Sequence, residues 1–317
     1  MPLRSRPFGT REAWPVDPGN EWRKHHSNSI NPALYGGFMG REEFPRVCVV
    51  TPTKNRPDRL LRAMTSVKAQ VGVTVHHIVL GDDCPFLADA GNLEELSNRF
   101  PGATIRNVRR SHFGGVPREE LEYIPGRLAH LRNLGIKMAD AEYVAHLDDD
   151  NVFHPTHLRS LVDLLRANPT AQVAHSWRRL LTQEGVELVP DGEDPWYGEP
   201  AKRAHSYERL RALGIFEPGS CVMRDTLRVG DQIRGVDTSE CLVRVSLHEQ
   251  IPFPTRFSQQ QKQLGYTEDL AFSQELVRQD VPVLCSQQAT VDYFMGGHSN
   301  SKPFVELRDA RLHIPPS

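Results

Sequence analysis

The stretch "RNLGIKMADAEYVAHLDDD", residues 132–150, passes from a helical pattern through a short apolar run into three consecutive aspartates. Apolar residues between 128 and 138 recur at helical spacing, and "EYVAHLDDD", residues 142–150, is predicted to form a buried strand. Three adjacent carboxylates repel one another, and a bound divalent cation would relieve that repulsion. The stretch therefore predicts a helix, then a strand, then a charged site at the end of the strand.

The alternation of helix and strand continues on both sides of this stretch. Apolar periodicity and proline or glycine breaks predict strands at residues 46–51, 73–83, 103–108, 171–177 and 281–285, and helices at residues 57–70, 91–100, 126–140, 154–169 and 267–279. Strands that alternate with helices of this length are typical of right-handed βαβ units. The sequence therefore predicts an α/β fold with a mostly parallel central sheet flanked by helices.

The two ends of the chain differ from this regular centre. Residues 1–45 are rich in Pro, Gly, Arg and Trp without a sustained period, which predicts an irregular N-terminal extension. Residues 46–177 hold most of the predicted strand–helix units. Residues 178–317 are expected to belong to the same domain, although regularity weakens between 178 and 265.

Composition argues against several classes of protein. The 317 residues carry a net charge of -2 and no basic stripe, so nucleic acid is not expected as a partner. Mean hydropathy is -0.48, and no apolar run approaches the roughly 20 residues that span a bilayer. The five cysteines contain no CxxC pair, and the N-terminus lacks the apolar core of a secretory signal. We expect a cytoplasmic protein without a transmembrane segment; the sequence leaves homo-oligomer formation open.

Three polar clusters follow three predicted strands, at residues 51–56, 82–83 and 148–150. In open α/β sheets, ligands bind at the carboxyl ends of the strands. If the three strands are parallel neighbours, their clusters meet at one edge of the sheet. The sequence therefore predicts a shared ligand site there.

Within the last cluster, alternate side chains of a strand-like exit share a face, so Asp148 and Asp150 are expected to point the same way. Two carboxylates in that arrangement suit Mg²⁺ or Mn²⁺, which takes one or two protein carboxylates together with substrate phosphates. Asp149 is expected on the other face, where it would hold the turn or touch a substrate. The alternative is local: Asp150 or Asn151 makes a turn or caps the following helix.

The first two clusters suit a nucleotide. "TPTKNRP" offers hydroxyl groups, Lys54 and Arg56, but it matches neither a P-loop nor a dinucleotide fingerprint. An aspartate of "GDDCP" could accept hydrogen bonds from a nucleobase imide or a ribose hydroxyl. For both clusters, an ordinary solvated turn is the competing interpretation.

Two later segments add further candidates. In "GYTEDL", Asp269 is a possible general base beside Glu268, although acids in the first turn of a helix also complement its dipole. In "MGGHSNSK", His298 is a candidate metal ligand and Lys302 a candidate partner for phosphate. An exposed loop without function is the alternative for the second segment.

The order of these segments resembles the family-2 inverting glycosyltransferases with the GT-A fold. The quoted segments "VVTPTKNRPDRLLRAMTSVKAQ", "HIVLGDDC", "HLRNLGIKMADAEYVAHLDDD" and "GYTEDLAFSQELVRQDVPV" carry the likeness, which covers roughly residues 46 to 295. The resemblance implies a Rossmann-like GT-A domain with a nucleotide-sugar-binding half at residues 46–177. The acceptor-binding half and a C-terminal loop would then occupy residues 178–317.

The resemblance also implies roles for individual residues. The donor nucleotide would contact Thr51, Pro52, Thr53, Asn55, Arg56, Asp82, Asp83, Arg132, Asp148, Asp149 and Lys302. Asp148 and Asp150 would be the metal-binding DxD motif, with His298 as a further ligand, and Asp269 the catalytic base of an ED pair with Glu268. The usual "DDGSTD" turn of the family reads "DDCPFL" here, so the base-contacting acid is either Asp82 or Asp83.

The implied activity is that of a metal-dependent hexosyl- or N-acetylhexosaminyl-transferase that uses Mn²⁺ or Mg²⁺. A nucleotide-diphosphate sugar would be the donor and the acceptor is unknown. Sugar-nucleotide nucleotidyltransferases share the architecture but carry a glycine-rich loop after the first strand, which "TPTKNRP" lacks. A silent nucleotide-sugar-binding module is the third alternative. Stacking on the acceptor is open to the aromatic residues Trp177, Trp196, Tyr197 and Phe216, for each of which ordinary packing is the alternative.

Overall fold

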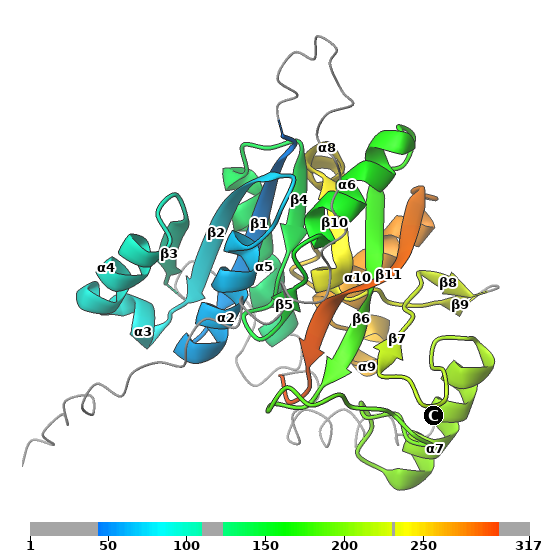
Figure 1. The fold of residues 1–317 in the computed structure, drawn as a ribbon. Coiled ribbons are helices and arrows are strands. Elements are labelled where there is room, and N and C mark those ends of the chain that lie inside the picture. Colours follow the sequence, from blue (N-terminus) through cyan, green and yellow to red (C-terminus); the bar gives the residue numbers. More distant parts are fainter. Residues whose placement is uncertain (1–43, 110–122, 230–231, 298–317) are drawn as a thin grey trace, which may run out of the picture. The chain divides into compact units, whose positions relative to one another are not determined.

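The structure is a computed structural model that describes residues 44–109, 123–229 and 232–297. Within these ranges a single large sheet forms the centre of the fold (Figure 1). Its strand order is β3-β2-β1-β4-β10-β6-β11-β5, and β7 pairs with β6 outside this path. The strands are β1 (Arg46–Thr53), β2 (Thr74–Asp82), β3 (Thr104–Val108), β4 (Tyr143–His146), β5 (Val152–Phe153), β6 (Val173–Leu181), β7 (Val222–Met223), β10 (Cys241–Arg244) and β11 (Val283–Phe294).

The longest strand pairings are parallel. β1 lies between β2 and β4 and is parallel to both, β2 is parallel to β3, and β6 is parallel to β11. β10 is antiparallel to its neighbours β4 and β6. The predicted α/β class with a mostly parallel sheet is confirmed. The antiparallel strand in its centre comes from the half that was predicted to be irregular.

Helices cover both faces of this sheet (Figure 1). One face carries α2 (Pro57–Lys68) and α6 (His157–Ala167), and the other carries α5 (Tyr123–Met138), α8 (Val245–Gln250) and α10 (Glu268–Arg278). Because side chains alternate across a strand, β1 sends Val47 and Val49 into the first core and Cys48 and Val50 into the second. All four side chains are fully buried, so the sheet is rigidly packed where its strands lead into the polar clusters.

Shorter elements complete the described chain. They are α3 (Pro85–Ala88), α4 (Ala90–Arg99), α7 (Pro200–Ala212), the hairpin of β8 (Arg228–Val229) and β9 (Gln232–Ile233), the 3-10 helix η3 (Thr238–Glu240) and α9 (Gln259–Gln263). None of the helices in the described ranges is both long and apolar enough to cross a membrane. Most of the predicted N-terminal extension, together with His298 and Lys302, lies outside the described residues.

One predicted boundary is wrong in a way that matters for the site. β4 ends at His146, whereas the strand was predicted to continue to Asp150. The three aspartates follow in a short turn, in which Asn151 N–H donates to the Asp148 carbonyl at 3.1 Å. The alternation of strand side chains therefore does not govern where the three carboxylates point. The tertiary structure decides which side chains these carboxylates contact.

Candidate active site

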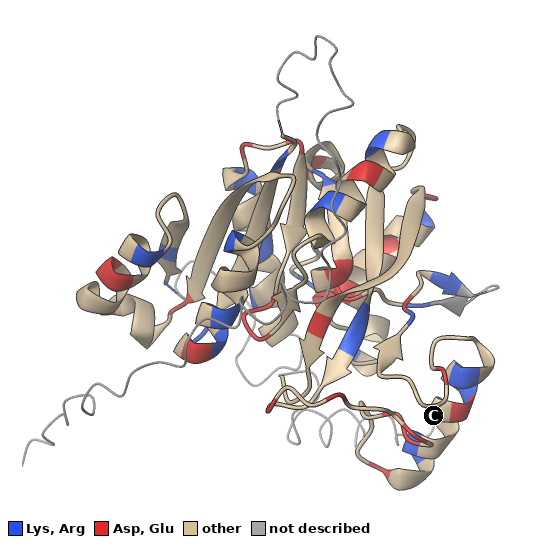
Figure 2. Cartoon of the chain, viewed as in Figure 1, with Lys and Arg blue, Asp and Glu red and all other residues tan. Residues whose placement is uncertain are grey.

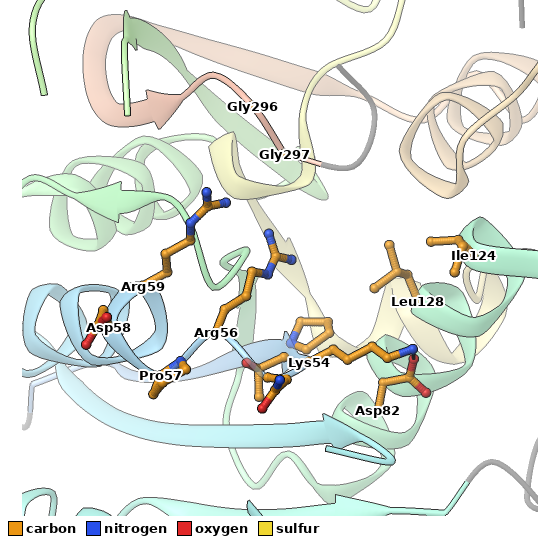
Figure 3. A pocket seen from close by; sticks show the side chains of 13 residues that line it. Lys54, Arg56, Pro57, Asp58, Arg59, Asp82, Ile124, Leu128, Gly296 and Gly297 are labelled. Atoms are coloured by element: carbon orange, nitrogen blue, oxygen red, sulfur yellow. Dashed lines mark ion pairs between the residues drawn. The ribbon is translucent and has the colours of Figure 1, made fainter. Parts of the chain in front are cut away.

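The carboxyl ends of β1, β2 and β4 meet at one edge of the sheet. Their registers pair Thr53 of β1 with Gly81 of β2, and Val50 of β1 with His146 of β4. The three predicted polar clusters are therefore neighbours, as parallel strands require. A pocket of about 580 Å³ opens there, lined by residues 52–59, Asp82, Ile124, Leu128, Gly296 and Gly297 (Figure 3).

Asp82 is the acid of the second cluster that lines this pocket. Arg127 Nε donates a hydrogen bond of 2.6 Å to Asp82 Oδ1, and Lys54 Nζ lies 3.6 Å from Asp82 Oδ2. Asp83 is exposed instead, at a φ of 49°, and its backbone N–H donates to the Val108 carbonyl. Of the two aspartates that the sequence could not separate, Asp82 is the one whose side chain is held at the pocket.

Arg56 neutralises two of the three adjacent aspartates. Its Nη2 lies 2.8 Å from Asp149 Oδ1, and its Nη1 donates a bond of 2.7 Å to Asp150 Oδ2. The Thr53 hydroxyl donates to the other oxygen of Asp149 at 2.7 Å. Residues of the first polar cluster therefore stabilise the aspartates of the third cluster. This pairing explains how three adjacent carboxylates are tolerated directly after a buried strand.

A second arginine, Arg59, reaches the same turn. Its Nη1 lies 3.3 Å from Asp150 Oδ2 and its Nη2 donates to Gln183 Oε1 at 2.6 Å. A Cβ at Gly297 would lie 3.1 Å from that Asp150 oxygen, so the glycine lets the backbone pass close to the carboxylate. Figure 3 shows the Arg56 and Arg59 side chains reaching toward the glycine segment. The sequence reasoning missed Arg59, which lies in the first turn of α2, three residues after the N-cap residue Arg56.

Burial changes the acidity of this turn. It raises the pKa of Asp149 to about 7, while Arg56 and the Thr53 hydroxyl act in the opposite direction. Burial also raises the pKa of Asp150, again opposed by Arg56. A cation brought next to a buried carboxylate favours its ionised form. The carboxyl groups of Asp149 and Asp150 are therefore ionised most readily when a cation lies beside them.

Arg132 connects the aspartate turn to the ED pair. Its Nη2 donates a bond of 2.6 Å to Asp148 Oδ1, and its Nε lies 3.4 Å from Glu268 Oε1. The Arg132 side chain is only 1% exposed, whereas that of Asp148 is 33% exposed. Arg132 thus lies behind Asp148 and holds it at the pocket.

Asp269 and Glu268 occupy the first turn of α10. Asp269 Oδ1 accepts hydrogen bonds from the Leu270 N–H at 2.8 Å and from the Thr267 hydroxyl. Thr267 stands at the N-cap but makes no side-chain capping bond to the helix backbone. Burial raises the pKa of Asp269, and it raises that of Glu268 to about 8. The Thr267 hydroxyl is therefore used to orient an acid that burial makes more basic.

A second pocket adjoins the first and brings the acids together. Both pockets are lined by Pro52, Arg56, Ile124, Leu128 and Gly297. The second is further lined by Pro125, Asp148, Asp149, Asp150, Asp237, Thr238, Thr267, Glu268, Asp269 and Tyr293. The cleft therefore runs from the Asp82 end, past the aspartate turn, to the ED pair.

Asp237 is a member of this lining that the sequence reasoning missed. It stands at the N-cap of η3, where its Oδ1 accepts a bond of 2.9 Å from the Ser239 N–H. Arg178 Nη1 lies 2.9 Å from its Oδ2. An aspartate ahead of Thr and Ser in an irregular segment looks like any capped turn. The fold alone brings this turn beside the aspartates.

The four aromatic residues predicted for the acceptor have different surroundings. Phe216 is 2% exposed and belongs to a core cluster, so it is unavailable for stacking on a ligand. Trp196 is partly buried, with its ring 6.0 Å from that of Tyr293, which lines the second pocket. Trp177 and Tyr197 are half-buried. Trp196 is thus the candidate of the four that touches the site's lining.

Carboxylates of the aspartate turn fit a divalent cation whose remaining ligands are water and substrate oxygens. Among the described residues, no three His, Cys, Asp or Glu side chains form a complete metal site. Mg²⁺ commonly takes one or two protein carboxylates and otherwise water and phosphate oxygens. Asp148 and Asp150 line the same pocket and supply two carboxylates of that kind.

The region that contains the aspartate turn matches a known protein family. Residues 125–224 match the family described as Glycosyl transferase family 2, and this range includes Arg132 and residues 148–150. This region belongs to glycosyl transferase family 2. The resemblance to that family drawn from the sequence motifs is confirmed.

The chain has curated relatives in bacteria. The chain is 30% identical over 124 residues to poly(ribitol-phosphate) beta-N-acetylglucosaminyltransferase TarP of Staphylococcus aureus (strain N315). This match covers 39% of this chain and 34% of that protein. It is 32% identical over 148 residues to succinoglycan biosynthesis protein ExoO of Rhizobium meliloti (strain 1021), covering 46% of this chain and 37% of that protein. The matched part spans about a third of the length of these relatives.

The chain is also similar to a solved structure of S. aureus TarS in complex with UDP-GlcNAc. The TM-score is 0.48 at 15% sequence identity, and the match covers 84% of this chain and 66% of that one.

Proposed function

We propose that this chain is an inverting glycosyltransferase that moves a sugar from a nucleotide-diphosphate sugar to an acceptor hydroxyl with the help of a divalent cation. One observation carries the proposal: Asp82, the aspartates 148–150 and Asp269 line two adjoining pockets at the carboxyl ends of parallel strands. A nucleotide-sugar transferase needs a nucleoside site, a diphosphate site and a base in that spatial order. The membership of residues 125–224 in glycosyl transferase family 2 supports it.

The nucleoside would bind at the Asp82 end of the cleft. Ile124 and Leu128 supply apolar side chains on the α5 side of this pocket, suited to the face of a base. Asp82 is oriented by Arg127 and Lys54, so its oxygens can accept hydrogen bonds from a base imide or a ribose hydroxyl. The predicted contacts of Pro52, Thr53 and Asn55 belong to the same pocket lining.

The diphosphate would bind where Arg56 and Arg59 reach the aspartate turn. Two guanidinium groups offer charge-assisted hydrogen bonds to phosphate oxygens. Asp148 and Asp150 would hold a bound Mg²⁺ or Mn²⁺, which supplies stabilisation of the negative charge that develops on a departing diphosphate. Arg132 holds Asp148 in place for this purpose. Lys302 and His298 keep their proposed roles toward phosphate and metal.

Asp269 would act as the general base. The acceptor hydroxyl gives its proton to Asp269 while its oxygen bonds to the anomeric carbon of the sugar. The bond from that carbon to the diphosphate oxygen breaks on the opposite face, and the electron pair leaves with the nucleoside diphosphate. Hydrogen bonds from Leu270 N–H and Thr267 fix one oxygen of Asp269, and burial raises the pKa of Asp269 toward the range useful for a base.

The first test is thermal stabilisation by UDP-GlcNAc, UDP-glucose, GDP-mannose and dTDP-glucose, each with and without Mn²⁺. UDP-GlcNAc comes first because the relative TarP is named an N-acetylglucosaminyltransferase. We expect a metal-dependent rise in melting temperature with at least one donor, and the absence of any such rise would contradict the proposal.

Two substitutions then separate binding from turnover. Asp150→Ala should weaken metal-dependent donor binding, whereas Asp269→Asn should keep binding and abolish release of the nucleoside diphosphate. Asp163→Asn, on the exposed surface of α6, is the matched control and should change neither. NMR of the product should show an anomeric configuration opposite to that of the donor; retention would contradict the inverting mechanism.

A further inference from the structure

Arg178 of β6 is surrounded by three carboxylates from the second half of the chain. Its Nη2 lies 2.9 Å from Asp225 Oδ2, and its Nη1 lies 2.9 Å from Asp237 Oδ2 and 3.3 Å from Glu240 Oε1. The Arg178 side chain is 9% exposed and that of Glu240 is fully buried. One guanidinium cannot balance three buried negative charges, so the role of each acid needs an explanation.

Glu240 is the most deeply buried of the three acids. Burial, followed by the charge of Asp225, raises the pKa of Glu240 well above its ordinary value. Asp225 and Asp237 each pair with one terminal nitrogen of the Arg178 guanidinium at 2.9 Å. Of these, Asp237 lines the pocket that holds the ED pair. The Arg178 cluster therefore presents the Asp237 carboxylate to the substrate cleft.

Arg178 is itself held in place by aromatic rings. The central carbon of its guanidinium lies 4.7 Å from the centre of the Tyr293 ring and 5.4 Å from that of the Trp196 ring. Figure 2 shows the basic segment of β6 beside the acidic segment of β11, where Arg179 and Asp292 pair at 3.2 Å. A guanidinium packed against two rings has little freedom to turn, so Arg178 can define the position of the Asp237 carboxylate.

The turn that carries Asp237 is fastened to the aspartate turn through Ser239. The Asp148 N–H donates to Ser239 Oγ at 3.4 Å, and Asn151 Nδ2 donates to the same oxygen at 3.0 Å. Ser239 N–H in turn donates to Asp237 Oδ1. These bonds place Asp237 at a set position relative to the DxD motif.

The location of Asp237 indicates what it contacts. In the proposed reaction the transferred sugar lies between the diphosphate, next to Asp148, and the attacking hydroxyl, next to Asp269. Asp237 lines the same pocket as both of these acids, and the charges of both act on it. A side chain that lies near both the diphosphate and the attacking hydroxyl is a neighbour of the sugar ring between them.

We propose that Asp237 accepts a hydrogen bond from a ring hydroxyl of the transferred sugar and that Arg178 positions it. The inference rests on the proposed glycosyl transfer and adds a donor-sugar contact to it. A carboxylate has about four acceptor positions, so Asp237 can receive a sugar hydroxyl in addition to the Ser239 N–H and Arg178. Asp237 is then a determinant of donor-sugar binding, and Arg178 is a positioning residue.

The test compares a nucleotide sugar with the same nucleotide without its sugar. Dissociation constants for UDP-GlcNAc and for UDP are measured by titration calorimetry with Mn²⁺, or for whichever donor pair stabilises the wild type. Asn caps a helix about as well as Asp, so Asp237→Asn keeps the turn and removes the charge. We expect roughly a tenfold to hundredfold loss of affinity for the nucleotide sugar, as for a hydrogen bond to a charged group, with unchanged affinity for UDP.

Arg178→Lys should show the same selective loss, because an ammonium group cannot bridge Asp225 and Asp237 as the guanidinium fork does. Asp163→Asn on α6 is the control and should bind both ligands like the wild type. Unchanged binding of both ligands by Asp237→Asn, or an equal loss for both, would overturn the inference. If the wild type binds no nucleotide at all, the proposed function fails first, and this contact fails with it.

Discussion

The Arg132 guanidinium donates a hydrogen bond of 2.6 Å to Asp148, with the arginine almost fully buried and the aspartate one-third exposed. The exposed acid faces the cleft while its partner is locked in the core by Glu268 and by the ring of Phe253, 5.8 Å away. This pair joins the substrate site to the packing of α5 and α10. Changes at Arg132 should therefore affect stability as well as binding.

Arg132→Met should lower the free energy of unfolding by about 1–3 kcal/mol, because it removes the charge-assisted hydrogen bond to Asp148 and the buried partner of Glu268. Urea denaturation of the isolated variant measures this loss. Lys137→Met is the matched control, since Lys137 lies exposed on the same helix and should change stability by no more than about 0.5 kcal/mol. A loss below about 1 kcal/mol for Arg132→Met would contradict the prediction.

Arg56→Gln should weaken binding of UDP by roughly tenfold to hundredfold, since it removes charge-assisted hydrogen bonds at the proposed diphosphate site. Calorimetry with UDP and Mn²⁺ measures the change. Lys68→Gln removes a charge from the far end of the same helix and should bind UDP normally. Normal UDP binding by Arg56→Gln would show that Arg56 serves only to pair Asp149 and Asp150.

Gly135→Ala should destabilise the fold, because a Cβ there would lie 2.4 Å from Val50 Cγ1 of β1. Overpacking of this kind costs about 1–3 kcal/mol. Val50→Ala removes the clashing methyl groups. The double variant should therefore lose less stability than the two single losses added together, by at least about 1 kcal/mol in denaturation experiments. Simple additivity would mean that α5 moves away from β1 at little cost.

The contribution of His77 to the free energy of unfolding should fall as pH falls below neutrality. Burial lowers the pKa of His77 from 6.5 to about 3, beside the Thr51 hydroxyl at 2.9 Å. Between these two values the unfolded chain binds a proton that the folded chain excludes. The folded state is therefore destabilised on acidification, by up to about 1.4 kcal/mol per pH unit for this residue.

Urea denaturation at pH 7, 6 and 5 checks the contribution of His77. His77→Gln keeps a polar partner for Thr51 but cannot bind the proton, so its stability relative to that of the wild type should rise as the pH falls. His205→Gln, on the exposed surface of α7, should keep the wild-type slope. Identical slopes for His77→Gln and the wild type would refute the assignment.

Several features of the site could be predicted from the sequence because they depend on local patterns. The apolar run before Asp148 and the alternation of strands with helices require a parallel arrangement, and parallel strands end at the same edge of a sheet. The clusters at residues 51–56, 82–83 and 148–150 had to meet for that reason. The family-2 resemblance rested on the same local segments and is confirmed over residues 125–224.

Local patterns did not determine the partners of the aspartate side chains. The strand periodicity predicted a common face for Asp148 and Asp150, but β4 ends at His146 and the three acids lie in a turn. In that turn Asp149 and Asp150 share Arg56, and Asp148 pairs with Arg132. Which partner each acid takes depends on contacts across more than ten residues of sequence.

The sequence by itself therefore determined the class of fold, the edge of the sheet at which polar groups gather, and the identity of most acids there. Only the tertiary structure decided that Asp82 rather than Asp83 lines the pocket, and that Arg178 brings Asp237 beside the ED pair. The physical reason is distance along the chain. Periodicity and turn chemistry act between near neighbours, whereas ion pairs and burial act between whichever segments the packed sheet brings together.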